Sequence, residues 1–258
     1  MLNANSPAVA IYRRGFLPLS ETFIADHISS LKRYRPLVMA DDLVEGHRLP
    51  DHKLVLLHGA DAGKLARFGH RLTGNYGPLK TFVSHRVDLI HAHFLQDGAA
   101  ILPFAARRRL PLVVTAHGYD ATVTAREHAR RTEGLWYLGL QPFMVRYAQG
   151  IICVSNWIRD CLLEAGFPQN KLRVIKLGID ATALPQPGSP YHRQGALFVG
   201  RLVEKKGVHH LIEAWSKLPR QLQHERLTII GDGPLMPDLV EQARRLNVPA
   251  HFLGARPR

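Results

Sequence analysis

The sequence of 258 residues contains little cysteine and no long hydrophobic run. Its two cysteines, Cys153 and Cys161, are too few for a disulfide framework, and no CxxC zinc pattern is present. Reduced thiols in a cytosol are the plain interpretation. The longest apolar stretch, GAAILPFAA at 98–106, is far too short to span a bilayer. The opening MLNANSPAVAIYRRG lacks a charged region followed by a long apolar one, so we expect no signal peptide.

Acidic residues are also scarce relative to basic ones. The sequence has 21 Asp and Glu against 34 Lys and Arg, which gives a formal net charge of +13. Such an excess favours an acidic partner, and nucleic acid, anionic lipid and phosphorylated small molecules all qualify. Each short basic cluster also fits an ordinary solvated face. No RNP, KH or zinc-finger pattern accompanies the charge, so we expect no nucleic-acid partner.

Short apolar runs alternate with longer amphipathic ones along the chain. The pattern predicts helices over 21–34, with Ser20 as N-cap, and over 98–109, 156–166, 207–218 and 235–246, a helix ending at 143–149, and helical structure in 59–82 with a Gly-rich break at 74–77. It predicts strands at 8–12, 36–40, 54–58, 88–94, 111–118, 150–155, 172–178, 196–200, 227–231 and 250–254.

This alternation of continuous apolar strands with helices predicts an α/β fold with doubly wound parallel sheets. Residues 183–195, ALPQPGSPYHRQG, contain three prolines and two glycines without apolar periodicity, and we interpret them as a linker. The expected organisation is therefore an N-terminal domain at 1–182, the linker at 183–195, and a C-terminal domain at 196–258.

The unusual polar residues follow the predicted strands directly. Open α/β sheets bind ligands outside the carboxyl ends of their strands. These positions are therefore candidate site residues: Arg13, Arg14 and Gly15, then Asp97, then His117 and Asp120, then Ser155 and Asn156, then Arg201, then Asp232 and Gly233.

The stretch ALFVGRLVEKKGVHHLIEAW at 196–215 places cations between a strand and a helix. Arg201 offers a planar fork of donors, Lys206 adds a compact charge, and a helix after Gly207 would point its positive end at the same spot. Together they indicate a diphosphate site. The alternative is a solvated charged loop in which Arg201 pairs with Glu204, and the residues alone leave both open.

Two further features are weaker. GDGP at 231–234 is a second Gly-rich turn after a strand, but Met236 stands where a dinucleotide motif needs glycine. His91 and His93 share one face of a strand, yet no carboxylate or cysteine stands at ligand spacing, so packing or hydrogen bonding is favoured over metal. His117 lies on a Gly-containing turn beside Asp120, where it could contact a sugar or phosphate or simply form a structural turn.

These features together resemble the retaining, nucleotide-sugar-dependent glycosyltransferases of family 4. The matching segments occur in the family's order: DLIHAHF, PLVVTAHGYDAT, ICVSNWIRDCLLEAGFPQNKLRVIKLGID, LFVGRLVEKKGVHHLIEAW, LTIIGDGP and AHFLGARP, which cover residues 88–258 approximately. LPLSETFI at 17–24 resembles the colanic-acid and amylovoran type of exopolysaccharide transferase. The resemblance implies the GT-B fold, two Rossmann-like domains facing a cleft, with the second one incomplete.

The resemblance also implies roles for particular residues. It assigns His117 to the transferred sugar as the catalytic contact, and Arg201, Lys206 and Gly15 to the donor diphosphate. Gly231, Gly233 and Gly254 would approach the donor nucleotide. On the acceptor side it places Ser20, Glu21, Thr22, His93 and Asp120.

The implied reaction moves a sugar from a nucleotide-diphosphate sugar to a lipid-linked saccharide, with retention and without a metal or other cofactor, in the synthesis of cell-surface polysaccharide. The expected location is cytoplasmic, with peripheral contact to the inner face of an anionic membrane. The family's E-x7-E motif, which would hold the donor sugar and ribose, is absent. We therefore expect a truncated chain of little or no activity, and the alternative function is a non-catalytic fragment that binds an anionic ligand or acceptor.

Overall fold

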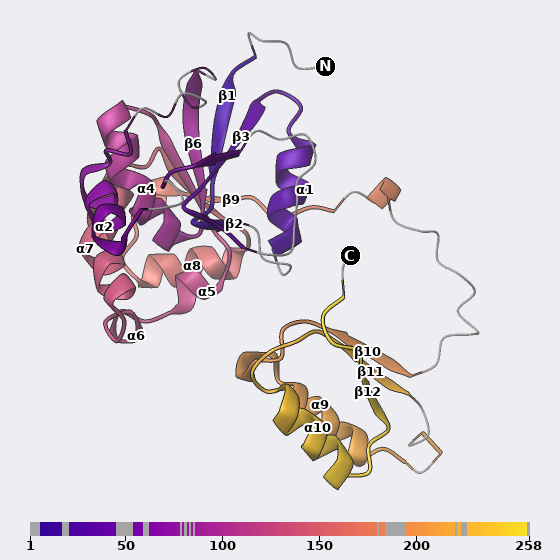
Figure 1. Cartoon of the computed structure of the whole chain (residues 1–258). Coiled ribbons are helices and arrows are strands. Elements are labelled where there is room, and N and C mark those ends of the chain that lie inside the picture. Colours follow the sequence, from indigo (N-terminus) through magenta and orange to yellow (C-terminus); the bar gives the residue numbers. More distant parts are fainter. Residues whose placement is uncertain are drawn as a thin grey trace. The chain divides into compact units, whose positions relative to one another are not determined.

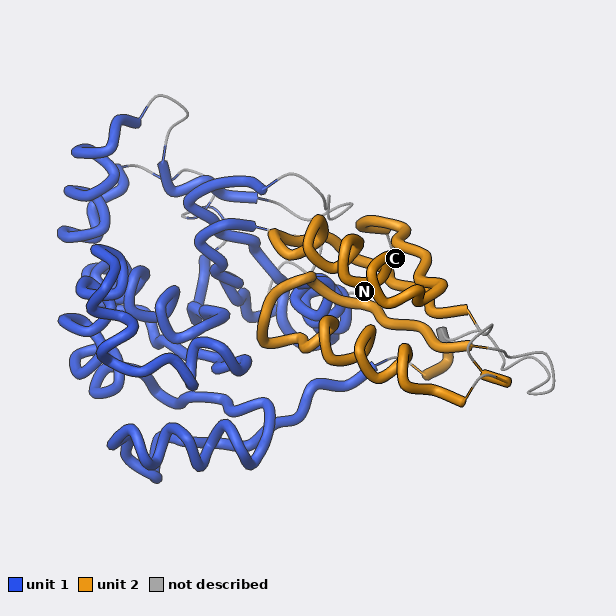
Figure 2. The backbone as a smooth tube through the Cα atoms, turned by 90° about the horizontal axis from the view of Figure 1, so that it is seen from below, with its two compact units in different colours: residues 1–179 blue, residues 180–258 orange. Residues whose placement is uncertain are grey.

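The structure is a computed structural model that describes residues 6–16, 21–44, 54–58, 62–77, 79, 82, 84, 86–179, 181–183, 195–219, 221–222 and 226–256. The chain forms two compact units, residues 1–179 and 180–258 (Figure 2). Ser20 and residues 184–194 of the predicted linker lie outside the described residues.

The first unit is built on a seven-stranded sheet in which every neighbouring pair is parallel (Figure 1). In spatial order the strands are β5 (Leu54–Leu56), β3 (Arg35–Ala40), β1 (Ala8–Tyr12), β6 (Val87–His93), β7 (Leu112–Ala116), β8 (Gly150–Cys153) and β9 (Leu172–Val174). The order runs outward in both directions from the β1–β6 pair, which is therefore the topological switch point where such sheets bind ligands.

Helices cover both faces of this sheet. They are α1 (Thr22–Ser30), α2 (Lys64–Thr73), α4 (Leu95–Arg108), α5 (Tyr119–Thr122), α6 (Ala125–His128), α7 (Thr132–Tyr147) and α8 (Asn156–Glu164). Strand β1 shows the two-sided burial, because Ala10 and Tyr12 pack into the cluster that contains α4 and α7, whereas Val9 and Ile11 pack against α1. Alternate side chains of a strand point to opposite faces, so one strand contributes to both cores.

The second unit carries a three-stranded parallel sheet in the order β10 (Ala196–Val199), β11 (Leu227–Ile230), β12 (Ala250–Phe252). Helices α9 (Val208–Ser216) and α10 (Met236–Arg245) pack on it through a small core that includes Val208, Ile212 and Leu239. On β10, Leu197 and Val199 remain 63 % and 67 % exposed. The described part of this sheet is therefore well covered on one face.

Several short elements complete the fold. They are the paired strands β2 (Gly15–Phe16) and β4 (Asp42–Leu43), and the 3-10 turns η2 (Gln169–Lys171), η3 (Ala181–Ala183) and η5 (Glu204–Lys206). The sequence did not predict β2, β4, α5 or α6, since elements this short show no periodicity. In the part of the chain that the structure describes, no helix is long and apolar enough to cross a membrane.

Candidate functional site

The first candidate site lies at the switch point, where loops after β1, β6 and β7 meet the start of α1. Arg13 follows β1 and forms a two-point ion pair with Glu21, with Nε–Oε2 and Nη2–Oε1 distances of 2.8 Å each. Its Nη1 also donates to Oδ2 of Asp97 on α4, at 2.7 Å. Because a guanidinium presents its donors in a planar fork, one side chain can hold two carboxylates in fixed positions.

Burial strongly influences the pKa values of two members of this network, Arg13 and Asp97. Burial lowers the pKa of Arg13, but its hydrogen bond to Glu21 and the charge of Asp97 outweigh that effect and raise the pKa overall. Asp97 is 1 % exposed, and burial raises its pKa although Arg13, Arg14 and the Arg14 amide oppose the shift. The sequence placed Arg13 and Asp97 after strands but did not predict that they bind each other. That pairing is visible only when β1 and β6 are neighbours.

Beside this network, four histidines form a contiguous cluster. The His93 ring stacks between His91 and His117, with centroid distances of 4.8 Å and 5.1 Å and interplanar angles of 18° for both pairs. His93 Nδ1 lies 2.8 Å from His117 Nε2, and His93 Nε2 lies 3.3 Å from His27 Nδ1. The sequence singled out His93 and His117, and the structure brings them together; it did not single out His27.

These histidines are neutral at neutral pH. Burial, together with the charges of Arg13 and His27, lowers the pKa of His117 to about 4. Burial likewise lowers the pKa of His91 to about 3 and that of His93 well below its usual value. The Nδ1 atom of His117 is buried and has no hydrogen-bond partner among the described residues. A neutral imidazole with an unpartnered nitrogen is suited to bind a polar ligand atom.

Asp120 holds the loop that carries His117. Its Oδ1 accepts hydrogen bonds from the backbone amides of His117 and Gly118 at 3.0 and 2.8 Å, and its Oδ2 accepts one from Leu95 at 3.0 Å. Burial raises the pKa of Asp120, and these amides oppose the rise. The carboxylate therefore joins the β7–α5 loop to the start of α4, because both of its oxygens accept hydrogen bonds from backbone amides.

The remaining acceptor-side predictions cluster at the start of α1. The helix begins at Thr22, and its N-cap position is Glu21, which makes no side-chain cap. The predicted N-cap Ser20 is therefore wrong by one residue, because Glu21 occupies that position and binds Arg13 instead. Gly15, which was assigned to the donor diphosphate, follows β1 and lies in the short strand β2, opposite Asp42 of β4; its role stays a prediction.

The second unit carries the predicted diphosphate cations. Arg201 follows β10, and Lys206 ends the 3-10 turn directly before Gly207, the N-cap position of α9. The Oε1 atom of Glu204 lies 3.5 Å from Nε2 of His209, and Glu204 does not pair with Arg201. The pKa of Lys205 is lowered by burial and by the nearby charges of Arg201 and Lys206, so three cations gather at this turn. Within the described residues, Arg201 and Lys206 form no ion pair.

Close backbone packing requires glycine at two positions of the second Gly-rich turn, Gly231 and Gly233. A Cβ at Gly231 would lie 1.8 Å from the carbonyl oxygen of Gly200, and one at Gly233 would lie 2.3 Å from that of Leu202. Both distances are far below van der Waals contact, so the turns after β10 and β11 approach as only glycine allows. The Gly231 amide also donates to the Gly254 carbonyl at 2.9 Å, which brings the three predicted nucleotide-side glycines together.

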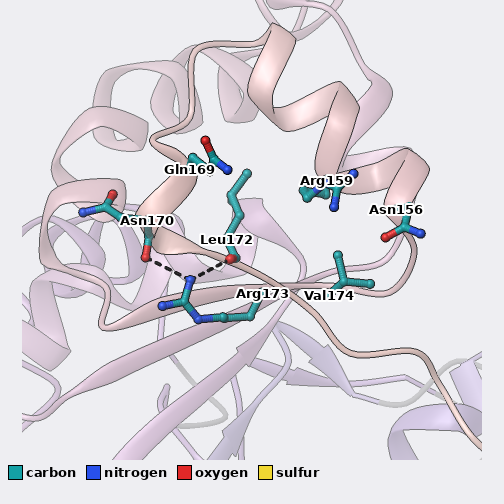
Figure 3. A pocket seen from close by; sticks show the side chains of 7 residues that line it. All are labelled: Asn156, Arg159, Gln169, Asn170, Leu172, Arg173 and Val174. Atoms are coloured by element: carbon teal, nitrogen blue, oxygen red, sulfur yellow. Dashed lines mark hydrogen bonds between the residues drawn. The ribbon is translucent and has the colours of Figure 1, made fainter.

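A separate open pocket lies at the β8–β9 edge of the first sheet (Figure 3). Its lining includes Asn156 and Arg159 of α8 and Arg173 of β9. Arg173 Nη1 donates to the backbone carbonyls of Asn170 and Leu172, and these two hydrogen bonds fix the position of its guanidinium. Of the candidate site residues that follow strands, Asn156 lines this pocket, whereas the residues assigned to the donor and the acceptor do not.

Solved structures identify the fold class of the chain. The Anabaena protein HepE, in complex with UDP-glucose, aligns with a TM-score of 0.71 at 20 % identity over 96 % of this chain and 69 % of its own. WaaG, a glycosyltransferase involved in lipopolysaccharide biosynthesis, aligns with a TM-score of 0.59 at 18 % identity over 96 % of this chain and 70 % of its own. The fold is that of the GT-B glycosyltransferases, as predicted.

The particular family follows from sequence models. Residues 32–183 match the model "Glycosyltransferase Family 4", and residues 183–257 match "Glycosyl transferases group 1". The chain belongs to glycosyltransferase family 4, which confirms the predicted family.

Curated proteins of related sequence match part of the chain. A glycogen synthase of Mycobacterium tuberculosis is 31 % identical over 176 residues, covering 66 % of this chain and 42 % of the relative. The putative colanic acid biosynthesis glycosyltransferase WcaL of Escherichia coli is 31 % identical over 153 residues, covering 58 % of this chain and 36 % of the relative. The matched regions span less than half the length of these relatives.

Proposed function

We propose that this chain binds a nucleotide-diphosphate sugar and takes part in transferring the sugar to a saccharide acceptor. The observation that carries the proposal is the cationic turn at the start of α9, where Arg201 and Lys206 have no carboxylate partner among the described residues. A helix N-terminus and two such cations form a site for the charge of a diphosphate. The solved HepE complex with UDP-glucose supports a donor of this kind.

The proposed chemistry places the charges where they are needed. The bond from the anomeric carbon to the diphosphate oxygen breaks, and negative charge develops on the leaving diphosphate. Arg201, Lys206 and the first amides of α9 stabilise that charge, so the transfer step itself needs no metal. A new bond forms to the acceptor oxygen on the same face of the sugar, which retains the configuration, and the acceptor proton passes to the leaving phosphate.

The first unit would supply the sugar and acceptor contacts. The buried Nδ1 of His117, for which the described part of the chain supplies no hydrogen-bond partner, is proposed to contact the transferred sugar. Glu21, Thr22 and His93 are proposed to line the acceptor side, and Asp120 to position His117 through the backbone amides. The proposed acceptor is a lipid-linked saccharide of a cell-surface polysaccharide, and the similarity to WcaL, a putative colanic acid biosynthesis glycosyltransferase, supports the polysaccharide part of this proposal.

Donor binding can be tested without turnover. Isothermal titration of the 258-residue chain with UDP, GDP and ADP should reveal one diphosphate that binds in the second unit. Arg201→Ala and Lys206→Ala should each weaken it roughly 10-fold, because a hydrogen bond to a charged group contributes about 1.5–3 kcal/mol. Lys217→Ala is the matched control, since Lys217 lies at the far end of α9 and pairs with Glu213. Equal losses in all three variants would contradict the proposed site.

An anionic membrane surface is a second proposed partner, and helix α2 favours it. Its Leu65, Phe68 and Leu72 side chains are 87 %, 54 % and 55 % exposed, on a helix that also carries Lys64. Apolar side chains beside basic ones suit the surface of a bilayer with acidic lipids. Co-sedimentation with phosphatidylglycerol vesicles should fall in Leu65→Ser/Phe68→Ser and be lost at high salt. Trp157→Ser removes a side chain of similar exposure, 63 %, on α8 and should leave it unchanged.

A further inference from the structure

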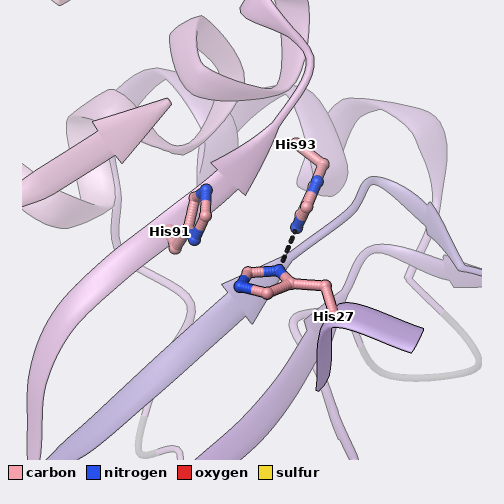
Figure 4. Close-up of side chains that lie close together, drawn as sticks. All are labelled: His27, His91 and His93. Carbon is pink, nitrogen blue, oxygen red and sulfur yellow. Dashed lines mark hydrogen bonds between the residues drawn. The ribbon is translucent and has the colours of Figure 1, made fainter. Parts of the chain in front are cut away.

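Three histidine side chains from two elements meet on the α1 face of the first sheet (Figure 4). Their ring nitrogens, one each from His27, His91 and His93, lie within 4.8 Å of one another. The close-up shows the His27 ring facing the two rings of β6, with its hydrogen bond directed to His93.

The fold explains why the three come together. Ile90 and Ala92 of β6 pack into the core with α4, so the alternate residues His91 and His93 point to the opposite face. Helix α1 covers that face through Ile24 and Ile28, and His27 lies one residue before Ile28. The spacing along β6 supplies two imidazoles, and the packing of α1 supplies the third.

Two of the rings are already oriented by a hydrogen bond to a residue outside the three-histidine cluster. His91 Nε2 lies 2.7 Å from the hydroxyl of Thr115, and His93 Nδ1 lies 2.8 Å from His117 Nε2. A metal-binding histidine usually uses its other ring nitrogen in this way, to fix the tautomer and hold the ring. If His93 donates to His117, its Nε2 lone pair is left facing His27.

We propose that His27, His91 and His93 bind one divalent transition-metal ion of the zinc class, with a fourth position open to water or another ligand. Imidazole nitrogens suit this class of ion, at about 2.0–2.1 Å from zinc. Nitrogens in a tetrahedral site lie roughly 3.3 Å apart at that bond length. His27 and His93 already have this separation, at 3.3 Å. The widest pair of nitrogens must close by up to about 1.5 Å, which requires the rings to turn when the ion binds.

The surroundings favour the neutral ligands that a metal needs. Burial lowers the pKa values of His27, His91 and His93, so the rings keep their lone pairs at neutral pH. A neighbouring cation, Arg13, is matched by the carboxylates of Glu21 and Asp97. The metal would thus add its charge to a region in which Arg13 is already paired.

Metal binding would also determine the proton position on His117. A metal on His93 Nε2 leaves the proton on His93 Nδ1, which then donates to His117 Nε2. His117 must then carry its own proton on Nδ1, the buried nitrogen that no described residue hydrogen-bonds. The metal would make His117 a hydrogen-bond donor toward the sugar; this consequence rests on the proposed function, whereas the binding itself does not.

Cobalt(II) is the probe for the test. The 258-residue chain, prepared without a polyhistidine tag and freed of metal, should bind one equivalent of Co²⁺ with the strong visible absorption of four-coordinate cobalt, and Zn²⁺ should displace it. His27→Gln and His91→Gln should each weaken binding at least 10-fold, and Thr115→Val should weaken it about 10-fold through loss of the outer hydrogen bond.

His70→Gln is the matched control. The Nδ1 atom of His70 lies 3.3 Å from Nδ1 of His58, and neither histidine belongs to the three-histidine cluster. This variant should leave cobalt binding unchanged. Thermal unfolding of each apo variant reports whether the fold survives, and His27 is on a half-buried helical position where glutamine is tolerable. Absence of the four-coordinate spectrum in the wild-type chain, or an equal loss in His70→Gln, would overturn the proposal. Either result leaves diphosphate binding by Arg201 and Lys206 untouched, so the two proposals fail separately.

Discussion

At the scale of single residues, Arg13 connects parts of the chain that are distant in sequence. It binds Glu21 beside α1 and Asp97 on α4, and both carboxylates are mostly buried. Removing one partner of a buried ion pair leaves an uncompensated charge, which costs more than the pair itself contributes. The Arg13 side chain therefore holds the switch-point loops in place.

Replacing Arg13 with glutamine should destabilise the chain by about 3 kcal/mol at neutral pH, measured by urea unfolding. The loss should shrink as the pH falls. Burial already raises the pKa of Asp97, and without Arg13 the pKa should rise further, so the carboxyl becomes neutral at a higher pH in the variant. The part of the stabilisation that Arg13 gains from Asp97 exists only while Asp97 is ionised, and that part disappears as the pH falls through the pKa of Asp97. Arg159→Gln, which breaks the exposed pair with Asp160, should change stability by less than about 0.5 kcal/mol.

Asp120→Asn is expected to lower the free energy of unfolding by about 1–3 kcal/mol, because one carboxylate oxygen becomes an amide that cannot accept from the backbone. Three backbone amides depend on this side chain. Guanidinium unfolding should reveal the loss, and Asp160→Asn, at an exposed position of α8, provides the comparison. A variant as stable as the wild type would show that the His117 loop does not need the carboxylate.

The site residues that the sequence revealed are those with a position relative to a strand end. His117, Asp120 and Arg201 follow apolar strands directly, and His93 ends one, so their placement could be predicted. His27 could not, since a histidine inside an amphipathic helix resembles any other polar residue of that helix. The partnership of Arg13 with Asp97, 84 positions apart, also depends on which strands become neighbours.

At the scale of elements, the apolar runs located every strand of the two main sheets, but their ends were less accurate. The run at 172–178 was expected to be one strand, and β9 ends at Val174. Beyond it Ile175, Leu177 and Ile179 are 56 %, 51 % and 70 % exposed, so the chain leaves the sheet while the sequence remains apolar. Hydrophobicity predicts a strand only where a partner strand and a covering helix are present.

Helix α7 offers an internal comparison of two glycines. A Cβ at Gly134 would lie 2.0 Å from the backbone oxygen of His128, whereas one at Gly139 would meet nothing within 4 Å. Gly139→Ala should stabilise the protein by about 0.5–1 kcal/mol, since alanine favours helix. Gly134→Ala should destabilise it, because α6 and α7 can no longer approach closely. Thermal unfolding of both variants decides the matter, and equal shifts of the same sign would refute the packing role of Gly134.

At the scale of the whole molecule, the two compact units differ in how well each covers its sheet. The sheet of residues 1–179 has buried clusters on both faces, built around β1, whereas β10 of the second unit leaves Leu197 and Val199 exposed. Apolar burial is the main favourable contribution to folding, so the second unit has less stabilisation available within the described residues.

Backbone amides of β10 and β11 should therefore exchange hydrogen for deuterium faster than those of β1 and β6. A region with few buried apolar contacts opens at a lower free energy than a region with a two-sided core. If the proposed diphosphate site is real, a nucleotide diphosphate at 100 times its dissociation constant should slow exchange in β10, β11 and α9 by up to about 100-fold, because binding stabilises the closed state. Exchange in β1 and β6 serves as the internal reference and should stay unchanged. Protection that appears equally in both units, or in neither, would contradict a diphosphate site confined to the turn at Arg201 and Lys206.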